Sequence, residues 1–243
     1  MITLPRYPIS YLVRLTLVCS PVIFCYLSSN SETFVLHPTN YLEISVVRSL
    51  SITASPGVDG ILVRVLKENI DIMDEVLVNL YNRSIETATF PTPLKIAKVV
   101  PVYKQGDKND CQNYRPISVL PVINTIFEKL IARRIRTFLE AFHIIVPEQH
   151  GLRTNHSTST AVITVTELIN NAFDENKLVS GWFIDLKKAF DTVTHSMLLI
   201  KLEKYGFRGH AQQFCHSYLI ERSQVVPVGN VPGCPSWQCK ISI

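Results

Sequence analysis

The chain has 243 residues, 47% of them hydrophobic, and a formal net charge of +4 at pH 7. A chain of this length and apolar content can bury a substantial core, as one large domain or two small ones. Its six cysteines contain no Cys-x-x-Cys pair, and Cys234 and Cys239, with two histidines upstream, fit no common zinc-ligand spacing. We therefore expect reduced thiols in an intracellular protein, of the cytoplasm or the nucleus, rather than a zinc site.

The N-terminal segment is mostly apolar but poorly defined. Residues 9–27 are mostly apolar, although Pro21 interrupts them and Arg14 lies within them. Arg6 and residues 15–18 imitate the cationic start and short apolar core of a secretory signal. A membrane span needs about 20 apolar residues with few or no charges, so the segment is marginal for that role. We expect residues 1–50 to be a poorly specified leader, disordered or degenerate, and a membrane-associated protein is the weaker alternative.

The first defined elements are a turn and a helix. Residues 55–60 read Ser-Pro-Gly-Val-Asp-Gly, in which proline presets one backbone angle and glycine permits a positive φ. Apolar residues then recur at three- and four-residue spacing over residues 61–80, which predicts a helix. The proline-containing segment 90–93 ends it.

A β-hairpin follows. Residues 97–104 and 114–120 each read as a strand, and the polar loop 105–113 joins them. In this hairpin the two arms present Lys104 and Arg115.

The clearest helix covers residues 125–142. Thr125 and Glu128 have the spacing of a capping box, and an apolar stripe runs along the helix. The helix belongs to a basic segment, residues 91–153, with ten Lys or Arg against five Asp or Glu. Such a segment favours a partner that carries phosphates, although a solvated basic surface is the alternative. The arginines that fall largely off the apolar stripe are Arg133, Arg134 and Arg136.

The remaining pattern mixes strands and helices. Residues 149–153 form a polar turn, residues 157–172 a helix, and residues 197–205 a helix that Gly206 ends. Between these helices, an apolar run that begins at Trp182 reads as a strand. The fold class expected is α+β, with helices packed on a small, mostly antiparallel sheet.

The most informative stretch is residues 183–191. Its apolar strand carries Asp185 out of the core, and a pair of lysines, an alanine and Phe190 follow. A carboxylate and cations in this order suit a place where a metal ion and a nucleotide meet. Asp191, six residues further on, reads as a local hydrogen-bonding or capping group rather than a metal ligand.

Six blocks between residues 55 and 228 together resemble the reverse transcriptase domain of non-LTR (LINE-type) retrotransposons. Each block alone is weak, whereas six in the same order are specific. The blocks are residues 55–60, 95–108, 113–120, 127–129, 149–153 with 157–158, and 183–193. The resemblance implies a right-hand polymerase, with fingers and the start of the palm in residues 51–180 and a palm strand with following helices in residues 181–228.

The resemblance also implies a two-metal site for nucleotidyl transfer. Asp185 would be the catalytic carboxylate, and with the Leu186 carbonyl it would bind Mg²⁺, because hard cations prefer oxygen ligands. An RNA template, a DNA primer and deoxynucleoside triphosphates would be the partners. Lys104 and Arg115 would bind the triphosphate, and Phe190 would lie under the sugar. The block expected near the template and nucleotide contributes Gln149, Gly151 and Arg153.

The family pattern continues with a Gly-rich loop and an aromatic-x-Asp-Asp hairpin that complete the metal site. This sequence contains no Asp-Asp dipeptide, and Asp191 is its last aspartate. We therefore expect a reverse transcriptase fragment truncated before that motif, with a degenerate tail in residues 229–243 and no activity alone. The alternative is a non-catalytic protein, derived from such an element, that binds RNA or a primer–template.

Overall fold

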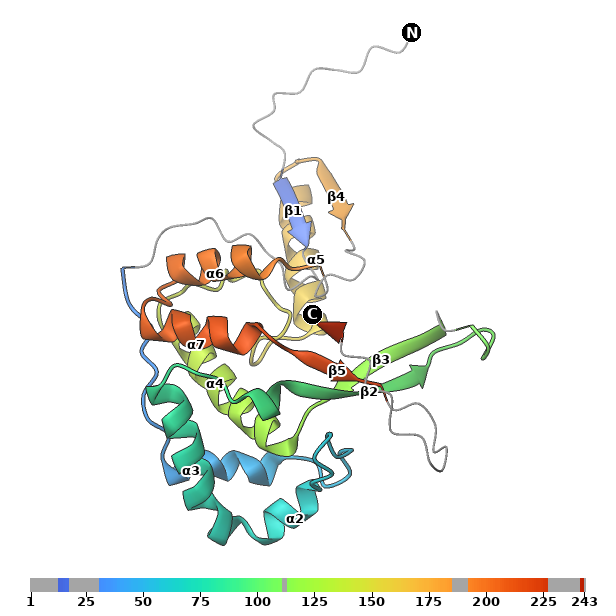
Figure 1. Cartoon of the computed structure of the whole chain (residues 1–243). Helices are drawn as coiled ribbons and strands as arrows, with labels where there is room; N and C mark the ends of the chain where they lie inside the picture. Colours follow the sequence, from blue (N-terminus) through green and yellow to red (C-terminus); the bar gives the residue numbers. More distant parts are fainter. Residues whose placement is uncertain (1–12, 18–30, 111–112, 185–191, 227–240, 243) are drawn as a thin grey trace. The chain divides into compact units, whose positions relative to one another are not determined.

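The computed structural model describes residues 13–17, 31–110, 113–184, 192–226 and 241–242, which form two compact units (Figure 1). The larger unit comprises residues 29–141 and 199–243, and the smaller comprises residues 1–28 and 142–198. Helices and small sheets together confirm the expected α+β class. No helix in the described part of the chain is long and apolar enough to cross a membrane.

The larger unit consists of helices and one four-stranded sheet. Its helices, including α6 at the boundary between the units, are α1 (Tyr41–Ile44), η2 (Ser45–Ser49), α2 (Val63–Glu68), α3 (Ile70–Glu86), η3 (Thr92–Lys95), α4 (Val122–Ala141), α6 (His195–Lys204) and α7 (His210–Leu219). Its strands are β2 (Ile96–Tyr103), β3 (Tyr114–Val119), β5 (Ser223–Val225) and β6 (Ile241–Ser242). The order in the sheet is β3-β2-β5-β6, in which only β2 and β5 are parallel.

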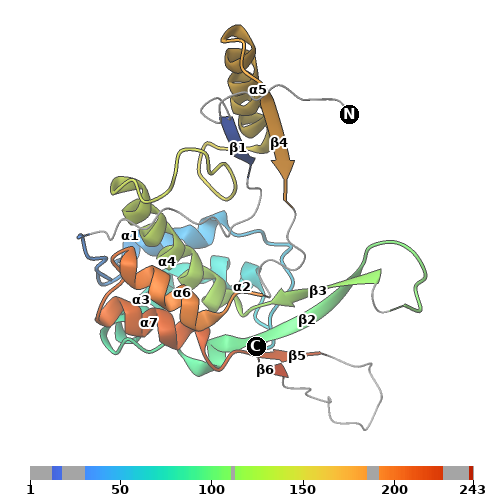
Figure 2. The ribbon, with the colours of Figure 1, turned by 90° about the horizontal axis from the view of Figure 1, so that it is seen from above.

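The predicted hairpin is present. Strands β2 and β3 pair antiparallel, from Lys98 opposite Val119 to Tyr103 opposite Tyr114. Ala97 and Val99, in the first half of β2, are buried, whereas residues 101–103 at its end are exposed. The hairpin therefore extends away from the helices of its unit (Figure 2).

The helix predicted over residues 61–80 is instead two helices. Helices α2 and α3 meet at Asn69, whose φ of −115° and ψ of 20° are not helical. The side-chain amide of Asn69 donates a hydrogen bond of 2.8 Å to the Val65 carbonyl. This local bond competes with the helical backbone pattern, which the apolar spacing could not reveal.

Helix α4 begins earlier than predicted, at Val122. The Thr125 amide donates to the Pro121 carbonyl over 3.0 Å, so Thr125 lies inside the first turn and does not cap the helix. The predicted Thr125–Glu128 capping box is therefore wrong. The side chain of Glu128 instead accepts a bond of 3.1 Å from Asn124.

The core of the larger unit is aromatic. The ring of Phe127 stacks on Tyr81 at 4.4 Å and on Phe90 at 5.4 Å, and Phe214 of α7 meets it edge-on at 5.8 Å. Stacked and edge-on pairs stabilise a core beyond the apolar area that they bury. Residues 31–50, which the sequence assigned to a poorly specified leader, join this core, with Phe34, Leu36, Ile44, Val47 and Leu50 buried.

The smaller unit contains α5 (Thr158–Asp174), β1 (Val13–Leu17) and β4 (Val179–Phe183). Strands β1 and β4 are parallel, with Val13 opposite Val179. Helix α5, predicted over residues 157–172, has a capping box in which the Ser157 hydroxyl accepts from the Thr160 amide at 3.2 Å. The chain reaches the end of β4 just before Asp185, which lies outside the described residues.

Candidate nucleotide and nucleic-acid site

The hairpin places Lys104 and Arg115 on one face. Arg115 lies opposite Val102 in the hairpin. Two residues further along the first arm, the Lys104 amide donates a hydrogen bond of 2.8 Å to the Asn113 carbonyl, so Lys104 lies opposite Asn113 in the same register. Side chains two residues apart along a strand share a face, so Lys104 and Arg115 are diagonal neighbours. Both are exposed, and neither has a carboxylate partner among the residues that the structure describes. Two free cations on one face can bind an anion with several oxygens, such as a polyphosphate.

The opposite face of the hairpin carries two tyrosines. The rings of Tyr103 and Tyr114 are 5.6 Å apart. The Tyr103 phenol donates to the Gly106 carbonyl at 2.6 Å, and the Tyr114 phenol donates to the Lys108 carbonyl at 2.9 Å. Each arm of the hairpin is thereby tied to the loop that joins the arms.

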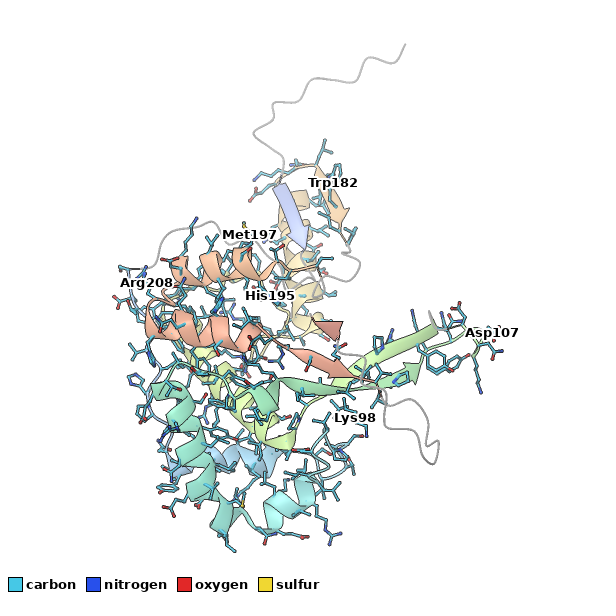
Figure 3. The ribbon with its side chains drawn as sticks, viewed as in Figure 1. Lys98, Asp107, Trp182, His195, Met197 and Arg208 are labelled. Carbon is cyan, nitrogen blue, oxygen red and sulfur yellow. The ribbon has the colours of Figure 1, made fainter. Side chains whose placement is uncertain are left out.

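The loop is also bonded within itself. The Asn113 side chain donates to the Asp107 carbonyl at 2.9 Å, and the Asn109 amide donates to the Asp107 carboxylate at 2.9 Å. Figure 3 shows Asp107 at the far end of the hairpin and Lys98 nearer the helices. Lys104 and Arg115 therefore lie on a hairpin whose arms are hydrogen-bonded to the connecting loop through Tyr103 and Tyr114.

A close backbone contact fixes the joint between β3 and α4. A Cβ added to Gly57, in the predicted turn 55–60, would lie 2.6 Å from the Pro121 nitrogen and 2.8 Å from the Leu120 carbonyl carbon. Only glycine allows this approach. A hollow of about 350 Å³ lies beside the joint, and its lining includes Leu50, Ser51, Val63, Ser118, Val122 and Thr125.

The block with Gln149, Gly151 and Arg153 forms one loop of the smaller unit. The Gln149 side chain donates to the Gly151 carbonyl at 3.5 Å, and Arg153 donates to the Val146 carbonyl at 3.2 Å. His150 joins the loop to α5 through a 2.9 Å bond with the Thr160 hydroxyl. The structure thus brings these three predicted residues together.

The predicted metal and sugar contacts fall on one short segment of the sequence. Asp185, Leu186, Phe190 and Asp191 lie outside the described residues. Within the described ranges, no group of three or more His, Cys, Asp or Glu side chains is placed to hold a metal ion.

Sequence reasoning misplaced one arginine of α4. Arg134 is not a free surface cation, because its guanidinium forms hydrogen bonds of 3.0 and 2.6 Å with the two carboxylate oxygens of Glu43. It also donates to the carbonyls of His37 and Pro38 and to the Thr39 hydroxyl. A seven-residue spacing from Phe127 to Arg134 was the available signal, since that spacing returns to the buried side of a helix.

Comparison with known proteins identifies the class. Residues 104–239, more than half of the chain, match the family model described as reverse transcriptase (RNA-dependent DNA polymerase). The chain therefore belongs to the reverse transcriptase family. This confirms the resemblance drawn from the motif blocks to a LINE-type reverse transcriptase domain.

Three of the relatives are proteins of Drosophila melanogaster mobile elements. The chain is 32% identical over 193 residues to the probable RNA-directed DNA polymerase from transposon BS. This alignment covers 79% of this chain and 21% of the relative. It is 29% identical over 185 residues to the RNA-directed DNA polymerase from mobile element jockey, covering 76% and 20%. It is 31% identical over 200 residues to the putative 115 kDa protein in type-1 retrotransposable element R1DM, covering 78% and 19%. The chain spans about a fifth of the length of these relatives.

Proposed function

We propose that this chain supplies the fingers and part of the palm of a retrotransposon RNA-directed DNA polymerase. That enzyme would extend a DNA primer along an RNA template with deoxynucleoside triphosphates. In this assignment residues 51–180 are the fingers and the start of the palm, and residues 181–228 continue the palm. Membership of the reverse transcriptase family supports RNA-directed DNA polymerisation as the reaction. The hairpin supports the assignment of nucleotide binding to this chain.

The observation that carries the proposal is the shared face of Lys104 and Arg115 on the projecting hairpin. Arginine offers a planar fork that matches phosphate oxygens, and lysine offers a point charge. Together they would bind the triphosphate of the incoming nucleotide. Phe190 would contact its sugar. The residues that would contact the template or nucleotide are Gln149, Gly151 and Arg153.

Asp185 would supply the carboxylate of the catalytic centre, with the Leu186 carbonyl beside it. A carboxylate and a carbonyl oxygen are suitable ligands for Mg²⁺. Two such ions, when bound, stabilise the attacking and leaving oxygens of phosphoryl transfer. A pair of ions needs more than one acidic ligand, and the only acids after Asp191 in this sequence are Glu203 and Glu221. We therefore propose that the 243 residues alone do not polymerise DNA.

Nucleotide binding tests the role of the hairpin. Arg115→Ala should weaken binding of a fluorescent deoxynucleoside triphosphate by roughly 10- to 100-fold, since a charge-assisted hydrogen bond contributes about 1.5–3 kcal/mol. Arg136→Ala, which removes an equally exposed arginine from α4, should change that affinity little. Equal effects of the two substitutions would show that Arg115 is only a surface charge.

A further inference from the structure

Helix α4 carries a stripe of exposed cations, formed by Lys129, Arg133 and Arg136. Steps of four and three residues keep these side chains on one side of a helix. They span about 10 Å along the helix axis. None of the three forms an ion pair with a described carboxylate. The stripe is therefore an elongated positive surface.

Two acidic side chains on or beside α4 already have partners. Glu43 is held by Arg134, with Arg133 contributing only through its charge. Glu128 accepts a bond of 2.7 Å from the Tyr218 phenol and lies 3.5 Å from Arg222. The bonds that hold these carboxylates in the fold keep them from forming ion pairs with the stripe.

The second acid of α4, Glu140, is half-buried one turn beyond Arg136. Its negative charge marks the C-terminal end of the positive surface. The stripe therefore keeps its positive charge from Lys129 to Arg136.

We propose that the Lys129–Arg133–Arg136 stripe binds the phosphodiester backbone of an RNA–DNA hybrid. Successive nucleotides of one strand advance roughly 3.4 Å along a B-DNA duplex, so a stripe of about 10 Å is on the scale of a run of about three phosphates. Contacts from cations to phosphates position a nucleic acid without reading its sequence. The proposal rests on the proposed function, and it separates backbone binding on α4 from triphosphate binding on the hairpin.

The test compares two variants with equal loss of charge. The stripe variant is Lys129→Gln, Arg133→Gln and Arg136→Gln. The control variant is Arg48→Gln, Arg83→Gln and Lys204→Gln, which removes three exposed cations from η2, α3 and α6. Affinity for a short RNA–DNA hybrid is measured from low to moderate salt, and urea unfolding checks that both variants fold.

The stripe variant should bind the hybrid more weakly and should flatten the plot of log affinity against log salt by about 2. Each lost phosphate contact removes roughly 0.7 to 0.9 from that slope. The control should keep nearly the wild-type slope, and the stripe variant should still bind a deoxynucleoside triphosphate normally.

Equal slopes for the two triple variants would overturn the proposal, because net charge alone would then explain binding. A stripe variant that binds the hybrid as the unaltered chain does would overturn it while leaving the proposed function intact. An unaltered chain that binds no hybrid at any salt concentration would contradict the proposed function itself.

Discussion

The rings of Tyr103 and Tyr114 lie 5.6 Å apart across the hairpin, on the face opposite Lys104 and Arg115. Both phenols donate hydrogen bonds to carbonyls of the connecting loop. The tyrosines thereby hold the loop in one arrangement before any ligand arrives. Preorganisation of this kind lowers the entropy that a nucleotide must remove on binding.

Replacing both tyrosines by phenylalanine should loosen the loop without unfolding the protein. Each lost hydrogen bond contributes about 0.5–1.5 kcal/mol, and both bonds are at the surface. Amide hydrogen exchange in residues 104–110 should therefore become several-fold faster, and nucleotide affinity should fall while the urea midpoint stays nearly constant. Tyr41→Phe, an exposed tyrosine on α1, is the control. Unchanged exchange in the loop would show that the phenols do not order it.

Arg134 should matter for stability and not for nucleic-acid binding. Its substitution by alanine removes the guanidinium bonds to the part-buried Glu43 carboxylate, which keeps the Asn40 amide as a donor, and the bonds to two carbonyls. We expect a loss of about 2–3 kcal/mol in the free energy of unfolding by urea. Arg136→Ala should change that free energy by less than about 0.5 kcal/mol, since it is exposed. Similar losses of unfolding free energy for Arg134→Ala and Arg136→Ala would contradict the structural role of Arg134.

The same ion pair makes stability depend on pH. Burial acts to raise the pKa of Glu43, but the hydrogen bonds from Arg134 and the Asn40 backbone, and the charges of Arg134 and Arg133, outweigh it and lower the pKa below its ordinary value of 4.5. A lowered pKa in the folded state stabilises the protein above the unfolded pKa, and this contribution is lost as the pH falls through the folded pKa. The difference in unfolding free energy between the unaltered chain and Arg134→Met should therefore shrink as the pH falls below 4.5. A difference that is constant with pH would argue against the pair.

Gly57 should be required for the joint between the hairpin and α4. A methyl group there would meet backbone atoms of Leu120 and Pro121, which cannot move aside as a side chain can. Gly57→Ala should cost about 2–3 kcal/mol in unfolding free energy. Gly60, with a φ of +69° and open space around it, offers the comparison, because alanine there adds only about 1 kcal/mol of backbone strain. A larger loss of unfolding free energy for Gly60→Ala than for Gly57→Ala would show that the close approach at Gly57 does not require glycine.

The sequence correctly predicted the elements that depend on residues close together in the chain. Alternation and turn residues located the hairpin, and that hairpin alone places Lys104 and Arg115 on one face. The stripe of apolar residues located α4 to within a few residues. Asp185, Leu186 and Phe190 were chosen from the motif, and the described residues do not include them.

Features that depend on distant partners were missed. Arg134 is held by Glu43, which is 91 residues away in the sequence, so no window along α4 could show that it is anchored. The pairing of β1 with β4 and the burial of Phe34 have the same cause. The break at Asn69 is local, but apolar spacing hides it because both helices continue the same pattern.

Primer extension on an RNA template tests the central claim most directly. The 243-residue chain is compared with a chain to which a Gly-rich loop and an aromatic-x-Asp-Asp hairpin are added at the C-terminus. The extended chain should lengthen the primer with Mg²⁺ present, Asp185→Ala should abolish extension, and Asp191→Asn should retain it. The unextended chain should bind the hybrid without lengthening the primer. Extension by the 243 residues alone, or extension that survives Asp185→Ala, would contradict the account.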